Sequence, residues 1–137
     1  MPSIDQPADI ARFVRDTLGC TCPPEVFEHI ELESIADDTN PHTLQRIVLG
    51  ERLLVYLACR TGPGGLPSRV AALTVRGRRD RDDHGYNRFR LVVAGGYEGA
   101  IRERAASRFN EIAEEDKKLH LHFVAVGDVL PLLCGSK

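Results

Sequence analysis

Two cysteines lie on either side of one threonine near the start of the chain, in the stretch Cys20-Thr21-Cys22-Pro23-Pro24. Proline suits the first turn of a helix and disfavours helical backbone in the residue before it, so we predict Cys22 as the N-cap of a short helix over 23–29. Unpaired N–H groups at a helix start lower the pKa of a thiol placed there. The pattern therefore predicts thiol redox chemistry, with Cys22 as the nucleophile and Cys20 as its partner.

The same two cysteines also suit a metal ion. Thiolates bind zinc, copper and iron–sulfur clusters, and Cys59 and Cys134 are the further candidate ligands for a site that begins with Cys20 and Cys22. One alternative remains open, because cysteine also packs well as a small apolar residue. The chain would then be a non-catalytic protein-interaction or accessory domain with structural cysteines.

A glycine pair, Gly95-Gly96, separates a predicted strand over 88–94 from a predicted helix over 98–117. Backbone N–H groups before a helix can hold an anionic group, so Gly95 and Gly96 are predicted as cofactor-binding residues. Glu98 opposes this because its charge repels an anion, and the stretch matches no glycine-rich nucleotide motif. Ordinary turn glycines are the alternative.

His120 and His122 are two positions apart in a predicted strand over 119–126, so they share one face of it. A pair at this spacing can chelate a metal ion, although a partly exposed sheet face also accommodates two histidines. His29, His42 and His84 stand alone in the sequence.

The segment 76–90 combines six arginines with Tyr86 and Phe89. Basic and aromatic residues together can bind single-stranded nucleic acid, but three aspartates within the segment offset much of the charge. The segment therefore favours a helix with many ion pairs over a nucleic-acid interface. Because tyrosine and arginine are frequent at interface hot spots, residues 86–89 are predicted as a docking place for a protein partner.

Length and composition indicate one globular domain over 1–137. The chain has 137 residues, of which 42% are hydrophobic and 28% charged, and its net charge is -2. This charge provides no general attraction to nucleic acid or to membrane surfaces. No apolar run approaches the ~18 residues of a membrane span, and the N-terminal residues do not resemble a secretory signal, so we expect a cytoplasmic protein.

Hydrophobic periodicity predicts the elements that position these residues. Residues 8–18 have the spacing of a helix, and Gly127-Asp128 is predicted to cap a short tail helix. The segments 44–49 and 52–59 are predicted to form a hairpin around Gly50-Glu51. The predicted strands are 29–35, 44–49, 52–59, 88–94 and 119–126.

The stretch 66–85 allows two interpretations. Leu66, Val70, Leu73 and Gly77 follow a helical spacing, which predicts a helix that Gly85 would end. The alternative is a strand over 70–75 followed by a polar hairpin. With the helix, strands and helices alternate through the second half of the chain, so its strands should be parallel. The predicted fold is α/β, a single domain with a mixed, mainly parallel sheet and helices packed on its faces.

Overall fold

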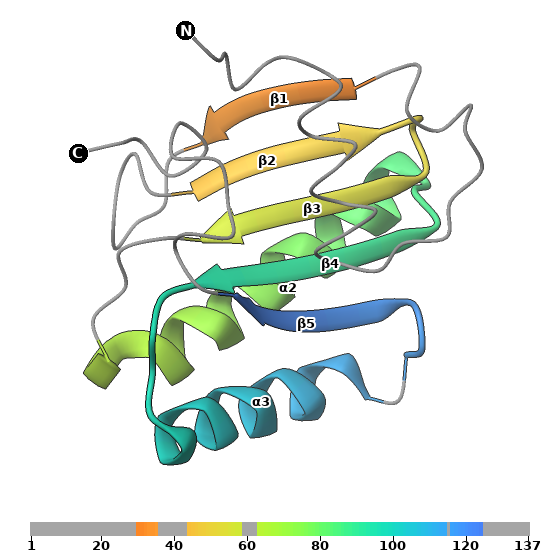
Figure 1. Cartoon of the computed structure of the whole chain (residues 1–137). Coiled ribbons are helices and arrows are strands. Elements are labelled where there is room, and N and C mark those ends of the chain that lie inside the picture. The colour runs from red at the N-terminus through yellow and green to blue at the C-terminus, as the bar shows by residue number, and fades with distance from the viewer. Residues whose placement is uncertain (1–29, 36–43, 59–62, 115, 125–137) are drawn as a thin grey trace, which may run out of the picture.

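The computed structural model describes residues 30–35, 44–58, 63–114 and 116–124 (Figure 1). The predicted helices over 8–18 and 23–29 and the tail helix lie outside these residues. The described elements, in chain order, are β1 (Ile30–Ile35), β2 (Leu44–Leu49), β3 (Leu53–Ala58), the 3-10 helix η3 (Pro63–Gly65), α2 (Leu66–His84), β4 (Arg88–Ala94), α3 (Gly99–Ala113) and β5 (Leu119–Val124).

The five strands form one sheet in the order β1-β2-β3-β4-β5. β1 and β2 are antiparallel, as are β2 and β3, whereas β3, β4 and β5 are parallel. The prediction of an α/β fold with a mixed sheet is confirmed. A mainly parallel sheet is not confirmed, because the described strand pairs divide equally between the two kinds.

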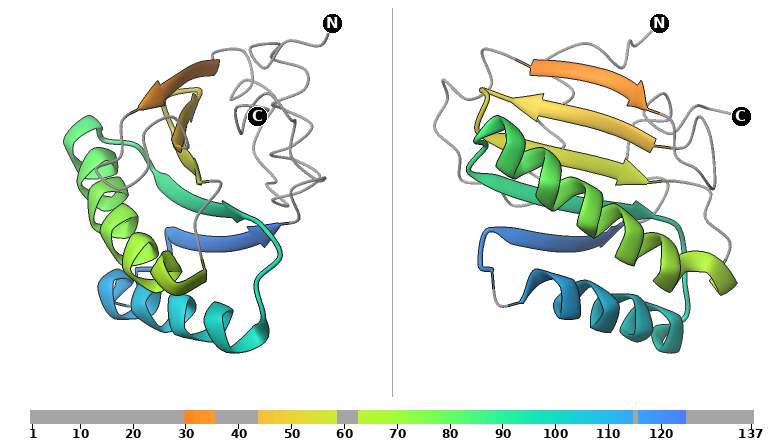
Figure 2. Two further views of the ribbon diagram at one scale, coloured as in Figure 1. Left: turned by 90° about the vertical axis from the view of Figure 1, so that its left-hand side faces the viewer. Right: turned by 180° about the vertical axis from the view of Figure 1, so that it is seen from behind.

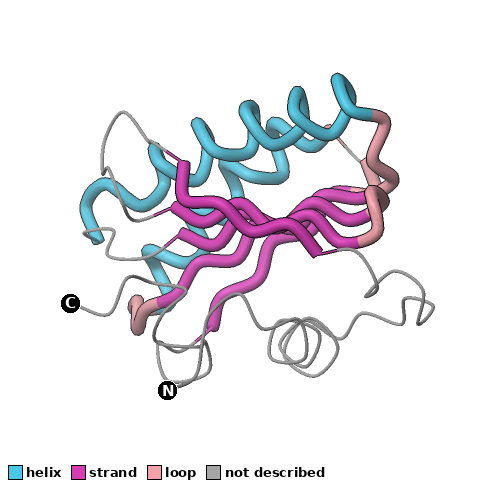
Figure 3. Tube along the Cα trace, turned by 90° about the horizontal axis from the view of Figure 1, so that it is seen from above, coloured by secondary structure: helices cyan, strands magenta, loops and turns pink. Residues whose placement is uncertain are grey.

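Both described α-helices cover the same face of the sheet (Figures 2 and 3). α2 connects β3 to β4 and α3 connects β4 to β5, so the two crossovers advance in the same direction. Right-handed crossovers that advance in one direction place their helices on one side of a sheet. Helices on both faces are therefore not confirmed for the described part of the chain. No helix within this part is long and apolar enough to cross a membrane.

α2 confirms the helical interpretation of 66–85 and shows that the strand alternative over 70–75 is wrong. Leu66, Val70 and Leu73 are buried in the core between helix and sheet, as the helical spacing predicts. The helix ends at Gly85, whose φ of 74° is the left-handed backbone that glycine adopts without strain.

α3 is shorter than predicted, because it ends at Ala113 and not at 117. Glu114 follows it with a left-handed φ of 49°, and the Asp116 N–H donates to the Ala113 carbonyl. The Arg78 Nη1 donates to the Ile112 carbonyl at 2.7 Å. These contacts satisfy carbonyls of the last turn and redirect the chain towards β5.

β3 lies at the centre of the sheet, as its uninterrupted apolar run predicts, and all six of its residues are buried. The hairpin from β2 is also confirmed. Gly50 and Glu51 have φ of 60° and 56°, and the Arg52 N–H donates to the Leu49 carbonyl. Positive φ at both turn residues is the pattern of tight hairpins that match the strand twist.

Candidate functional site

An open groove lies on the helix-covered side of the sheet, between the last turns of α2 and the strands β1 to β3. We call it the Asp80 groove. Its residues bring together carboxylates, guanidinium groups, a phenol and an imidazole. They are Glu33, Arg46, Tyr56, Arg76, Arg79, Asp80, Asp83 and His84.

The Asp80 carboxylate accepts hydrogen bonds from two strands. Arg46 donates through Nε to Oδ2 at 2.7 Å and through Nη2 to Oδ1 at 2.9 Å. Tyr56 donates its hydroxyl to Oδ2 at 2.7 Å. Only 12% of the Arg46 side chain and 12% of the Asp80 side chain are exposed. Two parallel hydrogen bonds between arginine and carboxylate fix both position and orientation, so Asp80 is held rigidly.

The electrostatics of the groove fix the protonation states of these three groups. Burial raises the pKa of Asp80, but the hydrogen bonds from Arg46 and Tyr56 outweigh it and hold that pKa below its usual value. The hydrogen bond to Asp80 raises the pKa of Arg46, and burial followed by the hydrogen bond to Asp80 raises the pKa of Tyr56. At neutral pH Asp80 is therefore an anion, Arg46 a cation and Tyr56 a neutral donor.

His84 is oriented by the same carboxylate. Its Nδ1 lies 2.9 Å from Asp80 Oδ1 and 2.9 Å from the Asp80 carbonyl oxygen. Both neighbours are acceptors, so Nδ1 carries the proton and a neutral ring keeps its lone pair on Nε2. The ring stacks on Tyr86 at 5.3 Å between centroids, and 54% of the side chain is exposed. The result is an accessible imidazole with one fixed tautomer.

Local sequence explains how the groove is assembled. Arg76, Asp80 and His84 recur every four residues in α2 and so share one face of the helix. Arg46 and Tyr56 are cross-strand partners in β2 and β3 and face that helix together. Sequence reasoning did not identify Arg46 or Tyr56. The signal in the sequence was the polar pair Gln45-Arg46 within the otherwise apolar β2, and a single hydroxyl within the apolar run of β3.

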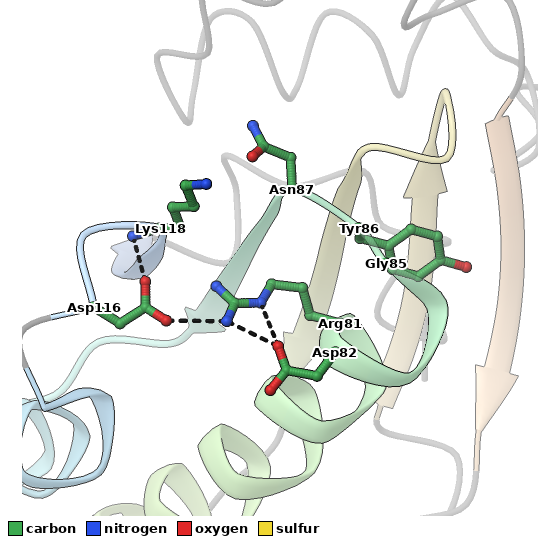
Figure 4. A pocket seen from close by; sticks show the side chains of 7 residues that line it. All are labelled: Arg81, Asp82, Gly85, Tyr86, Asn87, Asp116 and Lys118. Carbon is green, nitrogen blue, oxygen red and sulfur yellow. Dashed lines mark hydrogen bonds and ion pairs between the residues drawn. The ribbon is translucent and has the colours of Figure 1, made fainter.

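A second pocket lies at the end of α2, next to the turn that precedes β5 (Figure 4). Arg81 Nη2 contacts Asp82 Oδ1 at 2.9 Å and Asp116 Oδ2 at 3.0 Å, and the Lys118 N–H donates to Asp116 Oδ1 at 2.9 Å. Burial raises the pKa of Asp116, but these hydrogen bonds outweigh it and leave the pKa below its usual value. This pocket contains ion pairs without an oriented imidazole, so we interpret it as a structural connection.

His120 and His122 share a face of β5, as predicted, and this face is opposite to the helices. Leu119 packs with the helix-side core, whereas the Arg90 Nη1 lies 2.8 Å from His122 Nε2. A guanidinium at this nitrogen repels a cation and occupies the lone pair that a metal would need. No group of three or more candidate metal ligands occurs within the described residues.

The glycine turn after β4 keeps its predicted place between strand and helix. Gly95 has φ of 149°, and its N–H donates to the Val124 carbonyl at 2.9 Å. α3 begins with Glu98 as N-cap. One of the two amides is thus already paired within the sheet, and a cofactor site at Gly95 and Gly96 stays a prediction.

Phe89 is completely buried, so the prediction that it serves in an interface is wrong. Its ring meets Tyr56 edge-on at 5.0 Å, inside the core that α2 covers. The strand pattern places Phe89 inward, which excludes a role as an exposed anchor or as a stacking surface for nucleic acid. Tyr86, Asn87 and Arg88 remain at least partly exposed, and docking of a protein partner on them stays a prediction.

The predicted thiol and metal residues Cys20, Cys22, Cys59 and Cys134 all lie outside the described residues. Thiol redox chemistry and metal binding through them therefore stay predictions.

Comparison with known proteins gives no family, relative or structural neighbour. No protein-family model, no curated protein and no solved structure matches the chain.

Proposed function

We propose that this domain is a hydrolytic enzyme in which His84 acts as the general base on a phosphate ester bound in the Asp80 groove. The observation that carries the proposal is the fixed tautomer of His84. Two acceptors hold the proton on Nδ1, and the half-exposed ring, which lines the groove, keeps its lone pair on Nε2. General bases of hydrolases are oriented by a carboxylate in the same way.

In the proposed reaction, Nε2 accepts a proton from water as the water oxygen attacks phosphorus. The bond to the leaving oxygen breaks, and the imidazolium returns the proton to that oxygen. Asp80 stabilises the imidazolium through its carboxylate. Arg46 and Tyr56 act as positioning residues, since they hold Asp80 and are not placed at the reacting atoms.

The substrate class follows from the rim of the groove. Arg76 and Arg79 are exposed there, on the same stretch of α2 as His84. A planar guanidinium binds phosphate oxygens with two hydrogen bonds, so these residues suit an anionic ester. The proposal keeps the single α/β domain and the cytoplasmic location that the sequence predicts.

The test is release of p-nitrophenol from p-nitrophenyl phosphate and bis(p-nitrophenyl) phosphate. We expect His84→Gln to lower kcat/KM by about 10²–10⁴-fold, the usual contribution of a general base. Glu103→Gln is the control, because Glu103 is an exposed carboxylate of α3 away from the groove. Circular dichroism checks that each variant is folded. Equal rates for the wild type and His84→Gln on both substrates would refute the proposal.

A further inference from the structure

A second cluster of functional side chains lies on the opposite face of the sheet. Strand alternation directs Phe89 and Leu91 of β4 towards the helices. Arg88 and Arg90 therefore lie on the other face, where His120 is the register partner of Arg90 in β5. His122 belongs to the same face, two positions further along its strand.

The contact between Arg90 and His122 shows what this cluster can bind. Arg90 Nη1 lies 2.8 Å from His122 Nε2, and a guanidinium can only donate. His122 therefore accepts at Nε2, which makes it a neutral ring with its proton on Nδ1. Arg90 is only 8% exposed, and burial together with the neighbouring Arg88 charge holds its pKa below the usual value. The cluster concentrates positive charge in a partly desolvated place.

His120 adds a polar atom whose hydrogen-bonding capacity is not used. Its Nε2 is buried, and among the described residues no group forms a hydrogen bond with it. Its ring centroid lies 6.5 Å from that of His122. A buried polar atom without a partner is costly, and a bound oxygen atom would remove that cost.

We propose that Arg88, Arg90, His120 and His122 form a binding site for a small oxyanion, with phosphate as the matching class. The exposed Arg88 guanidinium supplies charge and donors, Arg90 adds positive charge, and the two imidazoles add N–H donors that are neutral before binding. A metal ion does not suit these residues, because the arginines repel it and Arg90 occupies His122 Nε2. The site is independent of the Asp80 groove, which lies on the helix-covered side of the sheet.

The experiment is a titration of the full chain with inorganic phosphate at pH 7, followed by NMR of the histidine ring protons. We expect saturable chemical-shift changes of the His120 and His122 ring protons that fit the binding of one phosphate per chain. Arg88→Gln changes an exposed side chain, so it should fold normally and weaken the phosphate affinity about tenfold, as expected for loss of a charged hydrogen bond. His120→Gln should weaken it as well.

Exposed Arg104 on α3 provides the matched control, since Arg104→Gln removes the same charge elsewhere. Equal weakening in Arg88→Gln and Arg104→Gln would show a general charge effect and overturn the proposal. Shifts confined to His84, or shifts that do not saturate, would also overturn it. A shift confined to His84 would at the same time favour phosphate binding in the Asp80 groove, so the two proposals are distinguished in one experiment.

Discussion

Gly77 in the middle of α2 lies directly against the ring of Phe89 in β4, so that a Cβ atom on Gly77 would overlap the ring. Phe89 is fully buried and also meets Tyr56 edge-on, so its ring is packed in the core on the sheet side as well. The absence of a side chain at position 77 is thus what lets the helix approach the sheet above the core of β3 and β4.

We predict that Gly77→Ala destabilises the domain, although alanine is the better helix former. Helix propensity would contribute about 1 kcal/mol in favour of alanine, whereas overpacking against a fixed ring costs about 1–3 kcal/mol. Urea unfolding should show a net loss. The control is Ala72→Gly at an exposed position of the same helix, which should lose about 1 kcal/mol from propensity alone.

A double variant tests whether steric overlap with the Phe89 ring is what destabilises Gly77→Ala. Phe89→Leu creates space beside position 77, so Gly77→Ala should cost less in the Phe89→Leu background than in the wild type. Additive effects of the two changes would contradict the packing account.

A second prediction concerns Glu51, which has a left-handed φ of 56° in the turn between β2 and β3. A residue with a Cβ atom is destabilised by about 1 kcal/mol in this left-handed conformation. Glu51→Gly should therefore raise the free energy of unfolding by about 0.5–1 kcal/mol, visible as a higher Tm. Glu51→Ala removes the charge but keeps the Cβ and should leave Tm nearly unchanged. If both variants raise Tm equally, charge and not backbone strain is responsible.

Much of the fold follows from local sequence pattern. The apolar run of β3, the alternation in β5 and the helical spacing of Leu66, Val70 and Leu73 place these elements correctly. Each of these signals comes from residues near one another in the chain. The helix end at Ala113 was misplaced, because the capping by Arg78 comes from another helix.

The candidate sites were much less predictable from the sequence, because their contacts join residues that lie far apart in the chain. Arg46 and Asp80 are 34 positions apart, and Arg90 and His122 are 32 apart. Such contacts depend on strand order and on which face each helix covers, and periodicity does not specify either. The prominent local feature, the Cys20–Cys22 pair, carries no information about them.

A third prediction follows from the hydrogen bonds of Asp80. Asp80→Asn keeps the shape but leaves Arg46 with only the exposed Glu33 as a charged partner, so we expect a loss of about 2–3 kcal/mol at pH 7. Because the folded pKa of Asp80 is depressed, its contribution is present above the unfolded pKa of about 4 and disappears as pH falls through the folded value. The difference between wild type and variant in urea unfolding should therefore shrink below pH 4.

Asp83 provides the comparison for Asp80, since it is an exposed aspartate on the same turn of α2. Asp83→Asn should change stability by less than about 0.5 kcal/mol at any of these pH values. A loss in Asp80→Asn that stays constant down to pH 3 would mean that the aspartate charge does not contribute.

The fourth prediction tests the thiol and metal hypotheses, which rest on the sequence Cys20-Thr21-Cys22-Pro23. We expect the native protein either to contain bound metal by elemental analysis or to be alkylated rapidly by iodoacetamide at pH 7. Cys20→Ser and Cys22→Ser should each abolish that property, because both sulfurs take part. Cys134→Ser shows whether a third cysteine is needed. Metal-free protein with slowly reacting thiols would exclude both hypotheses.

The last prediction concerns the loss of folding stability in acid that His122, on the sheet face opposite to the helices, should cause. Burial, followed by the positive charge of Arg90, lowers the pKa of His122 from 6.5 to about 4. The unfolded state therefore binds more protons between these values, and stability falls as pH decreases from about 6.5 towards 4. The full shift corresponds to about 3 kcal/mol, and solvent near the ring reduces the expected loss to about 1–2 kcal/mol.

Urea unfolding between pH 7 and 4.5 isolates this effect, because most carboxylates remain ionised there. His122→Gln keeps an acceptor for Arg90 but does not titrate, so it should lose clearly less stability than the wild type over this range. His120→Gln should remove a further part of the acid-induced loss of stability, since burial and Arg90 also lower the pKa of His120. Parallel pH profiles for wild type and His122→Gln would show that His122 does not resist protonation, and with it that Arg90 does not hold the ring as a neutral acceptor.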